Sequence, residues 1–425
     1  MKRSLSLLAV GLMALAVAGP AAAVPPSAAA PSENVEYIGG DNTSTGGHSV
    51  VEGKRLYVGA YGLGMKIYDI SDVESPQLIG EYLPGLRADA VPDAAVFGKK
   101  HIAVLNGTNR TAQTQQAEFL DVTDPANPEV LATFTGPEDG ESHNGDIVDK
   151  RKLWLPSAGR GQNGFRIYDL RPLLGKTPKA PKKLFTADPY GMWQASPYRG
   201  NKPEGGAFTH IHDITVYTDY KMVYPRAHHG PNPLAGKKVK RDIALAAEGG
   251  SYAGAGNTGS VFVIDITNPK KPVVLNRWLH ETGDGHHPVR YHHEAQFLDS
   301  DPRLMLVTDE DLHNGCGSAA GIVAVKLSPD LTSAKELSEW FVPLGTPAPV
   351  CSAHVFSSKG STVYMGAYGA GLQVLDYSKP AEPQQKGYFI AEGTNAWGAT
   401  YHKGVVYVGD MTRGLDVFRF TGDKD

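Results

Sequence analysis

A short unit recurs along the chain and constrains the fold more than any other feature. Residues 54–82 (KRLYVGAYGLGMKIYDISDVESPQLIGEY) and residues 361–389 (STVYMGAYGAGLQVLDYSKPAEPQQKGYF) share one pattern. The pattern is an apolar strand, a glycine-rich turn, a second strand that ends in Asp, a proline-containing turn and a third strand. Glycine, proline and Asp at these places are typical of short strands joined by tight turns. We interpret the unit as part of a small antiparallel sheet.

The strand that ends in Asp, which is the third strand of the complete four-stranded unit, keeps its length in most copies. The closing Asp comes five residues after the opening Gly in three copies; two copies are looser, and two keep the spacing but replace the Asp. They are, in that order, Gly64–Asp69, Gly164–Asp169 and Gly371–Asp376; the copies ending at Asp121 and Asp265; and Gly321–Lys326 and Gly414–Arg419. One further strand precedes the three strands of each copy, so the complete unit has four strands. One such sheet cannot bury both of its faces alone, whereas a ring of sheets can. The sequence therefore predicts an all-β fold, a seven-bladed β-propeller of four-stranded antiparallel blades.

The two ends of the chain predict how the ring closes. The seventh unit stops after its third strand, at residues 414–420, and residues 34–40 (NVEYIGG) resemble the fourth strand at residues 76–82 (PQLIGEY). We expect the N-terminal strand to complete the last blade. The prediction is a single propeller over residues 34–421 with a polar tail at residues 422–425. The 49 Gly and 30 Pro of the chain supply its many turns.

The fourth unit is interrupted by long insertions, and two segments fit its second strand. They are residues 221–225 (KMVYP) and residues 242–250 (DIALAAEGG). We favour the second segment, because it leads into a glycine-rich turn and then into the next strand.

The first 23 residues are typical of a secretory signal peptide. Lys2 and Arg3 precede an apolar stretch at residues 5–19, and alanines at residues 21–23 suit cleavage. Pro20 ends this stretch before it reaches the length of a membrane span. We expect residues 24–33, which are rich in Pro, Ala and Ser, to form a flexible tether. The protein is then secreted, periplasmic or extracellular, without membrane insertion after signal removal.

The charge balance excludes one class of partner. The formal net charge is −4, and loss of the signal would remove two basic residues. Nucleic-acid binders carry a basic footprint instead. The partners that remain are a small polar ligand or an extracellular protein or glycan, and we expect a monomer.

Histidine is concentrated where the predicted fold converges. The first strand of each blade lines the central channel of a propeller, and its start lies on the same face as the turn between the second and third strands. Five of the seven strand starts carry His, in a chain with 15 His. The residues at or near these starts are His48, Asp93, His143, His212, His293, His354 and Trp397.

Carboxylates accompany two of these histidines. Glu248 and Asp309 end the second strands of blades 4 and 5, whose first strands carry His212-Asp213 and His293-Glu294. Neutral imidazoles and carboxylates together form a ligand set for a divalent transition metal such as Cu, Zn or Mn. The predicted metal ligands are a subset of His48, His143, His212, Glu248, His293, Asp309 and His354, and the predicted ligand-contacting residues are Asp93, Asp213, Glu294, His313 and Trp397.

Two other interpretations of the same residues stay open. A His beside a carboxylate also suits acid–base catalysis without a metal. Alternatively, the polar ring serves only structure and hydration of the channel. Loop histidines at residues 228–229 and 286–287 would cover the same face.

Two further patterns favour structural roles. Cys316 and Cys351 are predicted on one face of adjacent blades, and export permits a disulfide between them; a metal site using Cys316 is the alternative. The repeated Asp at the end of each third strand suits capping of backbone N–H groups in the following turn. A calcium loop would need several closely spaced oxygen ligands, and the sequence has no such series.

The repeat motif consists of an apolar pair, then YD or LD, then ISD or YSK, then Pro. This motif resembles that of the LVIVD-repeat family of secreted and periplasmic β-propellers. This resemblance covers nearly all of residues 34–420 and implies the architecture, but no single reaction. In architecture and His-rich strand starts the chain is also similar to the selenium-binding-protein and methanethiol oxidase propellers, which use copper. We expect a binding propeller with a site for a divalent metal or small polar ligand. The alternatives are a metal-dependent oxidoreductase or hydrolase using the same residues, and a metal-free protein- or glycan-binding scaffold.

Overall fold

The structure is a computed structural model of the chain. It describes residues 28–85, 87–109, 114–135, 143–157, 164–200, 210–226, 233–249, 259–280, 291–310, 316, 321–346, 348 and 350–422. The predicted signal peptide and residues 423–425 of the predicted polar tail lie outside these residues.

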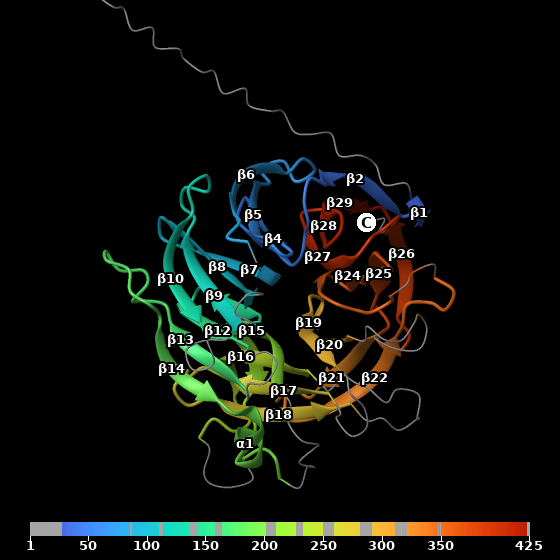
Figure 1. Cartoon of the computed structure of the whole chain (residues 1–425). Helices are drawn as coiled ribbons and strands as arrows, with labels where there is room; N and C mark the ends of the chain where they lie inside the picture. The colour runs from blue at the N-terminus through green and yellow to red at the C-terminus, as the bar shows by residue number, and fades with distance from the viewer. Residues whose placement is uncertain are drawn as a thin grey trace, which may run out of the picture.

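Seven antiparallel sheets stand in a ring around a central axis (Figure 1). From the axis outward, their strands are β3 (Ser49–Glu52), β4 (Arg55–Ala60), β5 (Gly64–Asp69) and β6 (Gln77–Tyr82) in blade 1; β7 (Arg87–Phe97), β8 (Lys100–Asn109), β9 (Thr114–Asp121) and β10 (Glu129–Thr135) in blade 2; β11 (Gly145–Val148), β12 (Leu153–Pro156), β13 (Phe165–Asp169) and β14 (Lys182–Ala187) in blade 3; and β15 (His210–Val223), β16 (Lys238–Gly249), β17 (Ser260–Asp265) and β18 (Val273–Leu279) in blade 4.

The remaining strands are β19 (His292–Leu298), β20 (Asp301–Asp309), β21 (Ile322–Leu327) and β22 (Ala334–Trp340) in blade 5; β23 (Phe356–Lys359), β24 (Thr362–Gly366), β25 (Leu372–Asp376) and β26 (Gln384–Ala391) in blade 6; and β27 (Ala396–His402), β28 (Val405–Asp410), β29 (Gly414–Phe420) and β2 (Val35–Asp41) in blade 7. The predicted seven-bladed propeller is confirmed.

The hydrophobic core lies between the blades. The second and third strands of a blade are buried along most of their length, as in β4 and β5, whereas the outer strand β6 is largely exposed. Between blades 4 and 5, Leu245, Phe297 and Met305 belong to one buried cluster. Each sheet therefore buries both faces against its neighbours, which explains why an isolated unit could not fold alone.

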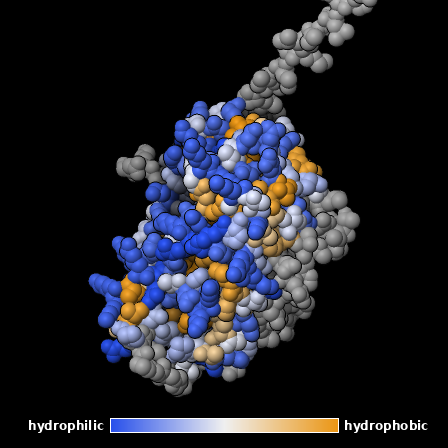
Figure 2. Space-filling model, turned by 90° about the vertical axis from the view of Figure 1, so that its left-hand side faces the viewer, coloured by the Kyte–Doolittle hydropathy of each residue, from blue (hydrophilic) through white to orange (hydrophobic). Residues whose placement is uncertain are grey.

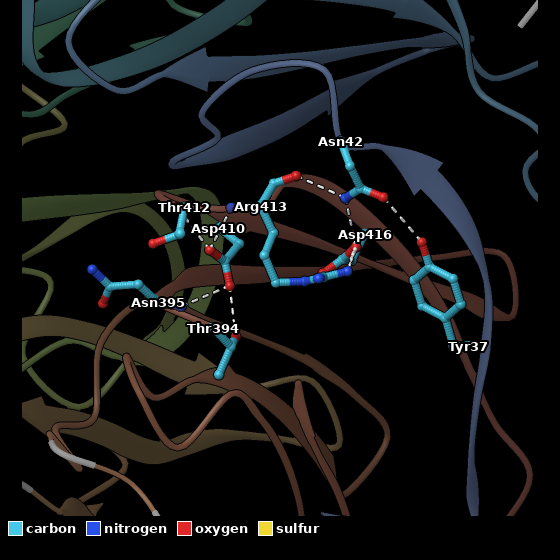
Figure 3. Close-up of polar contacts among 8 residues, drawn as sticks. All are labelled: Tyr37, Asn42, Thr394, Asn395, Asp410, Thr412, Arg413 and Asp416. Atoms are coloured by element: carbon cyan, nitrogen blue, oxygen red, sulfur yellow. Dashed lines mark hydrogen bonds and ion pairs between the residues drawn. The ribbon is translucent and has the colours of Figure 1, made fainter. Parts of the chain in front are cut away.

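The N-terminal strand closes the ring as the sequence predicts. Strand β2 pairs antiparallel with β29, the third strand of blade 7. Polar contacts lock this junction: Asn42 Nδ2 donates to the Arg413 carbonyl at 2.7 Å and to Asp416 Oδ1 at 3.0 Å (Figure 3). Arg413 Nε donates to Asp416 Oδ2 at 2.9 Å in turn. The two ends of the propeller thus belong to one sheet.

Three local features refine the sequence interpretation. The second strand of blade 4 is β16, which confirms the choice of residues 242–250, while residues 221–223 belong to β15. Strand β1 (Ala28–Pro31) adds to the outer edge of blade 6 by pairing with β26, although it falls in the range expected to be a tether. A short helix, α1 (Pro189–Gln194), follows β14 and is capped at its N-terminus by Asp188.

The repeated Asp residues cap turns, as predicted. Asp69 Oδ1 accepts a hydrogen bond from Ser71 N at 2.7 Å. The same contact to the N–H two residues later is made by Asp121, Asp169, Asp265 and Asp376. Such turns hold the third strand of a blade to the start of the fourth.

One side of the molecule has a mainly polar surface (Figure 2). Hydrophilic residues predominate on the side that Figure 2 shows, and hydrophobic residues lie among them in scattered groups. Within the described residues, no helix combines the length and hydrophobicity that crossing a membrane requires.

Candidate functional site

Four histidines from neighbouring blades form a chain of ring contacts near the axis. The ring centroids of His143 and His212 are 4.6 Å apart, those of His212 and His293 are 4.0 Å apart, and those of His293 and His354 are 3.8 Å apart. The residues come from the starts of the innermost strands in blades 3 to 6, or from just before them. The ring geometry therefore brings together four of the five histidines that the sequence placed at strand starts, and we call them the histidine row.

Hydrogen bonds to backbone carbonyls fix the tautomer of two of these imidazole rings. His212 Nδ1 lies 3.1 Å from the His293 carbonyl, and His354 Nδ1 lies 2.6 Å from the Trp397 carbonyl. A carbonyl oxygen only accepts, so each Nδ1 carries the hydrogen and each Nε2 keeps its lone pair. Metal-ligating histidines are commonly oriented by such a contact.

Glu310 adds a carboxylate to the histidine row. One donor atom each from His212, His293 and Glu310 lie within 4.8 Å of one another, and all three residues are buried. Tyr368 donates its hydroxyl hydrogen to Glu310 Oε1 at 2.5 Å, and His354 Nε2 lies 3.8 Å from the same oxygen. Glu310 follows β20 directly, one residue after the Asp309 that the sequence singled out.

The two predicted carboxylate ligands make other contacts. Glu248 Oε2 lies 2.8 Å from Arg277 Nη2, with the two side chains 1% and 0% exposed, and Ser260 donates to the same oxygen. Asp309 Oδ1 accepts from Tyr291 N at 2.7 Å. In the structure, the carboxylate beside the histidine row is therefore that of Glu310. The sequence interpretation selected Asp309 instead, which is the preceding residue.

Burial keeps these imidazoles neutral. Burial lowers the pKa of His212 and of His293 well below the ordinary value, and repulsion from neighbouring histidines lowers it further. Burial also lowers the pKa of His354 to about 3 and that of His48 to about 4, against weaker opposing backbone hydrogen bonds. Neutral imidazole is the form that binds metal ions.

One buried nitrogen in the histidine row has no hydrogen-bond partner among the described residues. His293 is 3% exposed, and its Nδ1 makes no hydrogen bond within the described part of the chain. Buried polar atoms are almost always satisfied, so an orphaned ring nitrogen needs an explanation such as an absent ligand. His48, the fifth predicted histidine, lines the central cavity and likewise has a buried Nδ1 without a partner.

A second polar layer lines the channel next to the histidine row. The cavity has a volume of about 670 Å³ and is lined by Asp93, Asp146, Asp213 and Glu294, from four consecutive blades, and by Trp397. Asp93 accepts from Ile147 N, Asp146 from Val216 N and Glu294 from Phe356 N. In each of these three contacts the carboxylate accepts a hydrogen bond from a backbone N–H on the innermost strand of the next blade.

These carboxyl groups share an unusual environment. Burial raises the pKa of Asp93 to about 6 and that of Glu294 to about 7. Burial together with repulsion between the carboxylates raises the pKa of Asp146 and of Asp213 well above the usual range. Asp93, Asp213 and Glu294 were predicted to contact a ligand, whereas Asp146 was missed, although it stands three residues after a strand-start histidine.

The disulfide predicted between Cys316 and Cys351 is present, with Cα atoms 4.9 Å apart. It ties Cys316, which lies between β20 and β21, to Cys351, three residues before His354. The predicted contact residue His313 and the loop histidines at residues 228–229 and 286–287 lie outside the described residues.

Comparisons with known proteins agree with the architecture. The model of the LVIVD repeat family matches residues 49–83, which form blade 1. The β-propeller domain of Cps50 (Swd1) from Myceliophteria thermophila superposes with a TM-score of 0.53 at 11% identity, over 91% of this chain and 99% of that domain. The computationally designed Ika8 protein gives a TM-score of 0.48 at 11% identity, over 93% and 98% of the two chains. No curated protein matches in sequence.

The class that these findings define is the seven-bladed β-propeller. Within this class, the family-model match and the ring of seven blades fit the LVIVD-repeat propellers, the family that the repeat motif indicated. At 11% identity the structural likeness concerns the fold alone. The function has to be argued from the site itself.

Proposed function

We propose that the protein is an exported β-propeller that binds a divalent transition metal through His212, His293 and Glu310. The observation that carries the proposal is the convergence of their donor atoms within 4.8 Å of one another. Two imidazoles and a carboxylate suit Zn, Cu or Mn. The Nδ1 of the deeply buried His293, which has no hydrogen-bond partner among the described residues, supports the proposal, because a bound ion would supply this histidine with a missing partner.

The three donor atoms lie within 4.8 Å of one another, which is wider than a formed coordination shell. Bonds of about 2.0–2.2 Å in a tetrahedral site hold donor atoms roughly 3.4 Å apart. Modest side-chain movement therefore brings the three donors onto one ion. His354 Nε2, which lies 3.8 Å from Glu310 Oε1, is the fourth donor.

Supporting contacts orient these ligands. The carbonyls of His293 and Trp397 hold His212 and His354 in the tautomer that leaves Nε2 available. The Tyr368 hydroxyl holds the carboxylate of Glu310. Partners of this kind fix ligand geometry and commonly change metal affinity by about 10- to 100-fold.

Export is part of the proposal and rests on the N-terminal sequence. Residues 1–23 have the pattern of a signal peptide. The disulfide between Cys316 and Cys351 supports this assignment, because structural disulfides persist mainly in oxidising compartments.

Metal analysis of the purified protein tests the site. We expect about one equivalent of Zn, Cu or Mn to be retained after dialysis, and His293→Ala or Glu310→Gln to abolish retention. His101→Ala is the matched control, because His101, near the start of β8, pairs with Glu52 at the end of β3 and is not part of the histidine row. Wild-type protein that is isolated without metal and takes up none of the three ions would refute the proposal.

A further inference from the structure

A histidine and two glutamates meet at the outer edge of the interface between blades 4 and 5. His280 directly follows β18, and Glu336 and Glu339 lie on β22; these are the outermost strands of the two neighbouring blades (Figure 1). His280 Nε2 lies 3.7 Å from Glu336 Oε1 and 3.8 Å from Glu339 Oε2. We call these three residues the rim cluster. It shares no residue with the histidine row or with the described lining of the central cavity.

A β-bulge turns both glutamates toward the same face of β22. Residues three positions apart on a regular strand point to opposite faces. Here Glu336 pairs with Val325 and Glu339 pairs with Val323, with a bulge between the two pairs. The extra residue of the bulge restores the alternation, so both side chains point the same way. Val323 and Val325 belong to the core cluster between blades 4 and 5, so this face is turned toward blade 4 and His280.

The other six blades show that the two glutamates are not part of the repeat. Their outer strands carry the same bulge. The residues in register with Glu336 and Glu339 are, pair by pair, Leu78 and Glu81, Val130 and Thr133, Lys183 and Thr186, Val274 and Arg277, Gln385 and Tyr388, and Tyr37 and Gly40. Among these described strands, only blade 5 places two carboxylates at the bulge.

His280 also departs from the repeat. Counted from the bulge, the corresponding residues are Pro84 in blade 1, Pro189 in blade 3 and Ala391 in blade 6. Residues that the repeat needs for its fold recur from blade to blade, as the capping Asp residues do. Three ionisable side chains that depart from the repeat and meet at one point indicate a role particular to this interface.

The imidazole is fixed, whereas the carboxylates are accessible. His280 is 2% exposed, its backbone N–H donates to the Gly259 carbonyl at 3.4 Å, and its ring centroid lies 5.4 Å from that of Trp278. The side chains of Glu339 and Glu336 are 14% and 35% exposed. An ion can therefore reach the rim cluster from solvent and meet a preset nitrogen donor.

The separations suit an ion held between these groups. At 3.7 and 3.8 Å, the contacts from His280 Nε2 to the two carboxylates are too long for hydrogen bonds. Zinc bonds of about 2.0–2.2 Å in a tetrahedral site hold nitrogen and oxygen ligands roughly 3.4 Å apart. Rotation of Glu336, the more exposed side chain, brings both carboxylates onto an ion bound at Nε2. An imidazole donor favours a transition metal over calcium, which takes oxygen ligands.

We propose that the rim cluster binds a second divalent transition metal ion such as Zn, through His280 Nε2, Glu336 and Glu339. This ion links the outer strands of blades 4 and 5. The inference goes beyond the proposed function and does not require the buried site. Because its carboxylates are in contact with water, which weakens their attraction for a cation, we expect dialysis to remove this ion.

Zinc titration of the dialysed protein tests the rim cluster. Calorimetry with ZnCl₂ should show one further equivalent bound by the wild-type protein, and the double variant Glu336→Gln/Glu339→Gln should lose this equivalent. Glu81→Gln is the matched control, because Glu81 has the register position of Glu339 in blade 1, where Pro84 stands in place of His280. Undiminished zinc uptake by the double variant overturns the proposal, as does equally tight binding of CaCl₂ by the wild-type protein.

Thermal unfolding provides a second measurement. A ligand that binds the native state raises the unfolding midpoint. Addition of ZnCl₂ should therefore raise the midpoint of the dialysed wild-type protein and of Glu81→Gln, but not that of Glu336→Gln/Glu339→Gln. The two substitutions preserve side-chain size on an outer strand, so the double variant should fold. An equal shift in wild-type protein and double variant contradicts the proposal.

The same samples separate this inference from the proposed function. Wild-type protein that retains metal on dialysis but takes up no further zinc contradicts only the rim cluster as a site. Protein isolated without metal that takes up a single equivalent of zinc, lost in the Glu336→Gln/Glu339→Gln variant, contradicts only the buried site.

Discussion

Replacing Glu248 by Ala separates two roles that its position in the sequence allowed. As a metal ligand, its loss would remove metal and leave the fold intact. In the structure, however, Glu248 Oε2 lies 2.8 Å from Arg277 Nη2, and the side chains are 1% and 0% exposed. We therefore expect a loss of stability rather than of metal.

The size of this loss follows from what remains behind. Without Glu248, the guanidinium of Arg277 stays buried over the rings of Phe262 and Tyr190, at 5.0 and 5.3 Å from their centroids. Breaking a buried ion pair from one side costs about 3–5 kcal/mol of unfolding free energy, because the remaining charge loses its carboxylate partner. Removing both charges in Glu248→Leu/Arg277→Met should recover most of that loss.

Urea unfolding followed by circular dichroism, together with metal analysis of the same samples, measures both effects. Glu248→Ala should lower the unfolding midpoint and retain metal, whereas Glu310→Gln should lose metal. A Glu248→Ala variant with wild-type stability and no metal would show that the ion pair is unimportant and that Glu248 is a ligand.

Three further perturbations test the fold and the site. Reduction of the Cys316–Cys351 bond, which spans 35 residues, should lower the unfolding free energy by about 4 kcal/mol in the chain-entropy model; urea midpoints with and without reductant measure this, and equal midpoints would contradict it. Burial opposes ionisation of Asp41, but hydrogen bonds, led by that from Lys66, outweigh it and lower its pKa from 3.8 to about 2. The stabilisation, about 2 kcal/mol, is therefore complete above pH 4 and lost as the pH falls from about 4 to 2; Asp41→Asn should reduce the acid sensitivity of unfolding in that window, and an unchanged pH profile would count against this assignment. Tyr368→Phe removes the hydrogen bond to Glu310 and should weaken metal binding by about 10- to 100-fold in a competitive titration, while an unaltered affinity would exclude an orienting role.

The architecture was predictable because its signals are local. A glycine-rich turn, a strand of fixed length and an Asp that caps the next turn recur with every blade, and the hydrogen bond from Ser71 to Asp69 shows the capping directly. The pairing of β2 with β29 was also predictable, since an incomplete last unit and an extra first strand are both visible in the chain.

The site was predictable only in part. The strand starts placed His143, His212, His293 and His354 on one face, and the structure joins them in a row. The carboxylates were harder, because the strand register in the sequence was good only to about two residues. Successive side chains of a strand point to opposite faces, so a shift of one residue exchanges Asp309 for Glu310.

The sequence by itself determined the number of blades, the closure of the ring and the face on which histidine gathers. Repeated local patterns specify these features, and each copy reinforces the others. Only the tertiary structure decided which polar atoms meet: Glu248 pairs with Arg277, Glu310 joins the histidine row, and Asp146 lines the central cavity with Asp93, Asp213 and Glu294. The physical reason is that these partners come from different strands or blades, where neighbouring strands and burial, rather than spacing along the chain, set each contact.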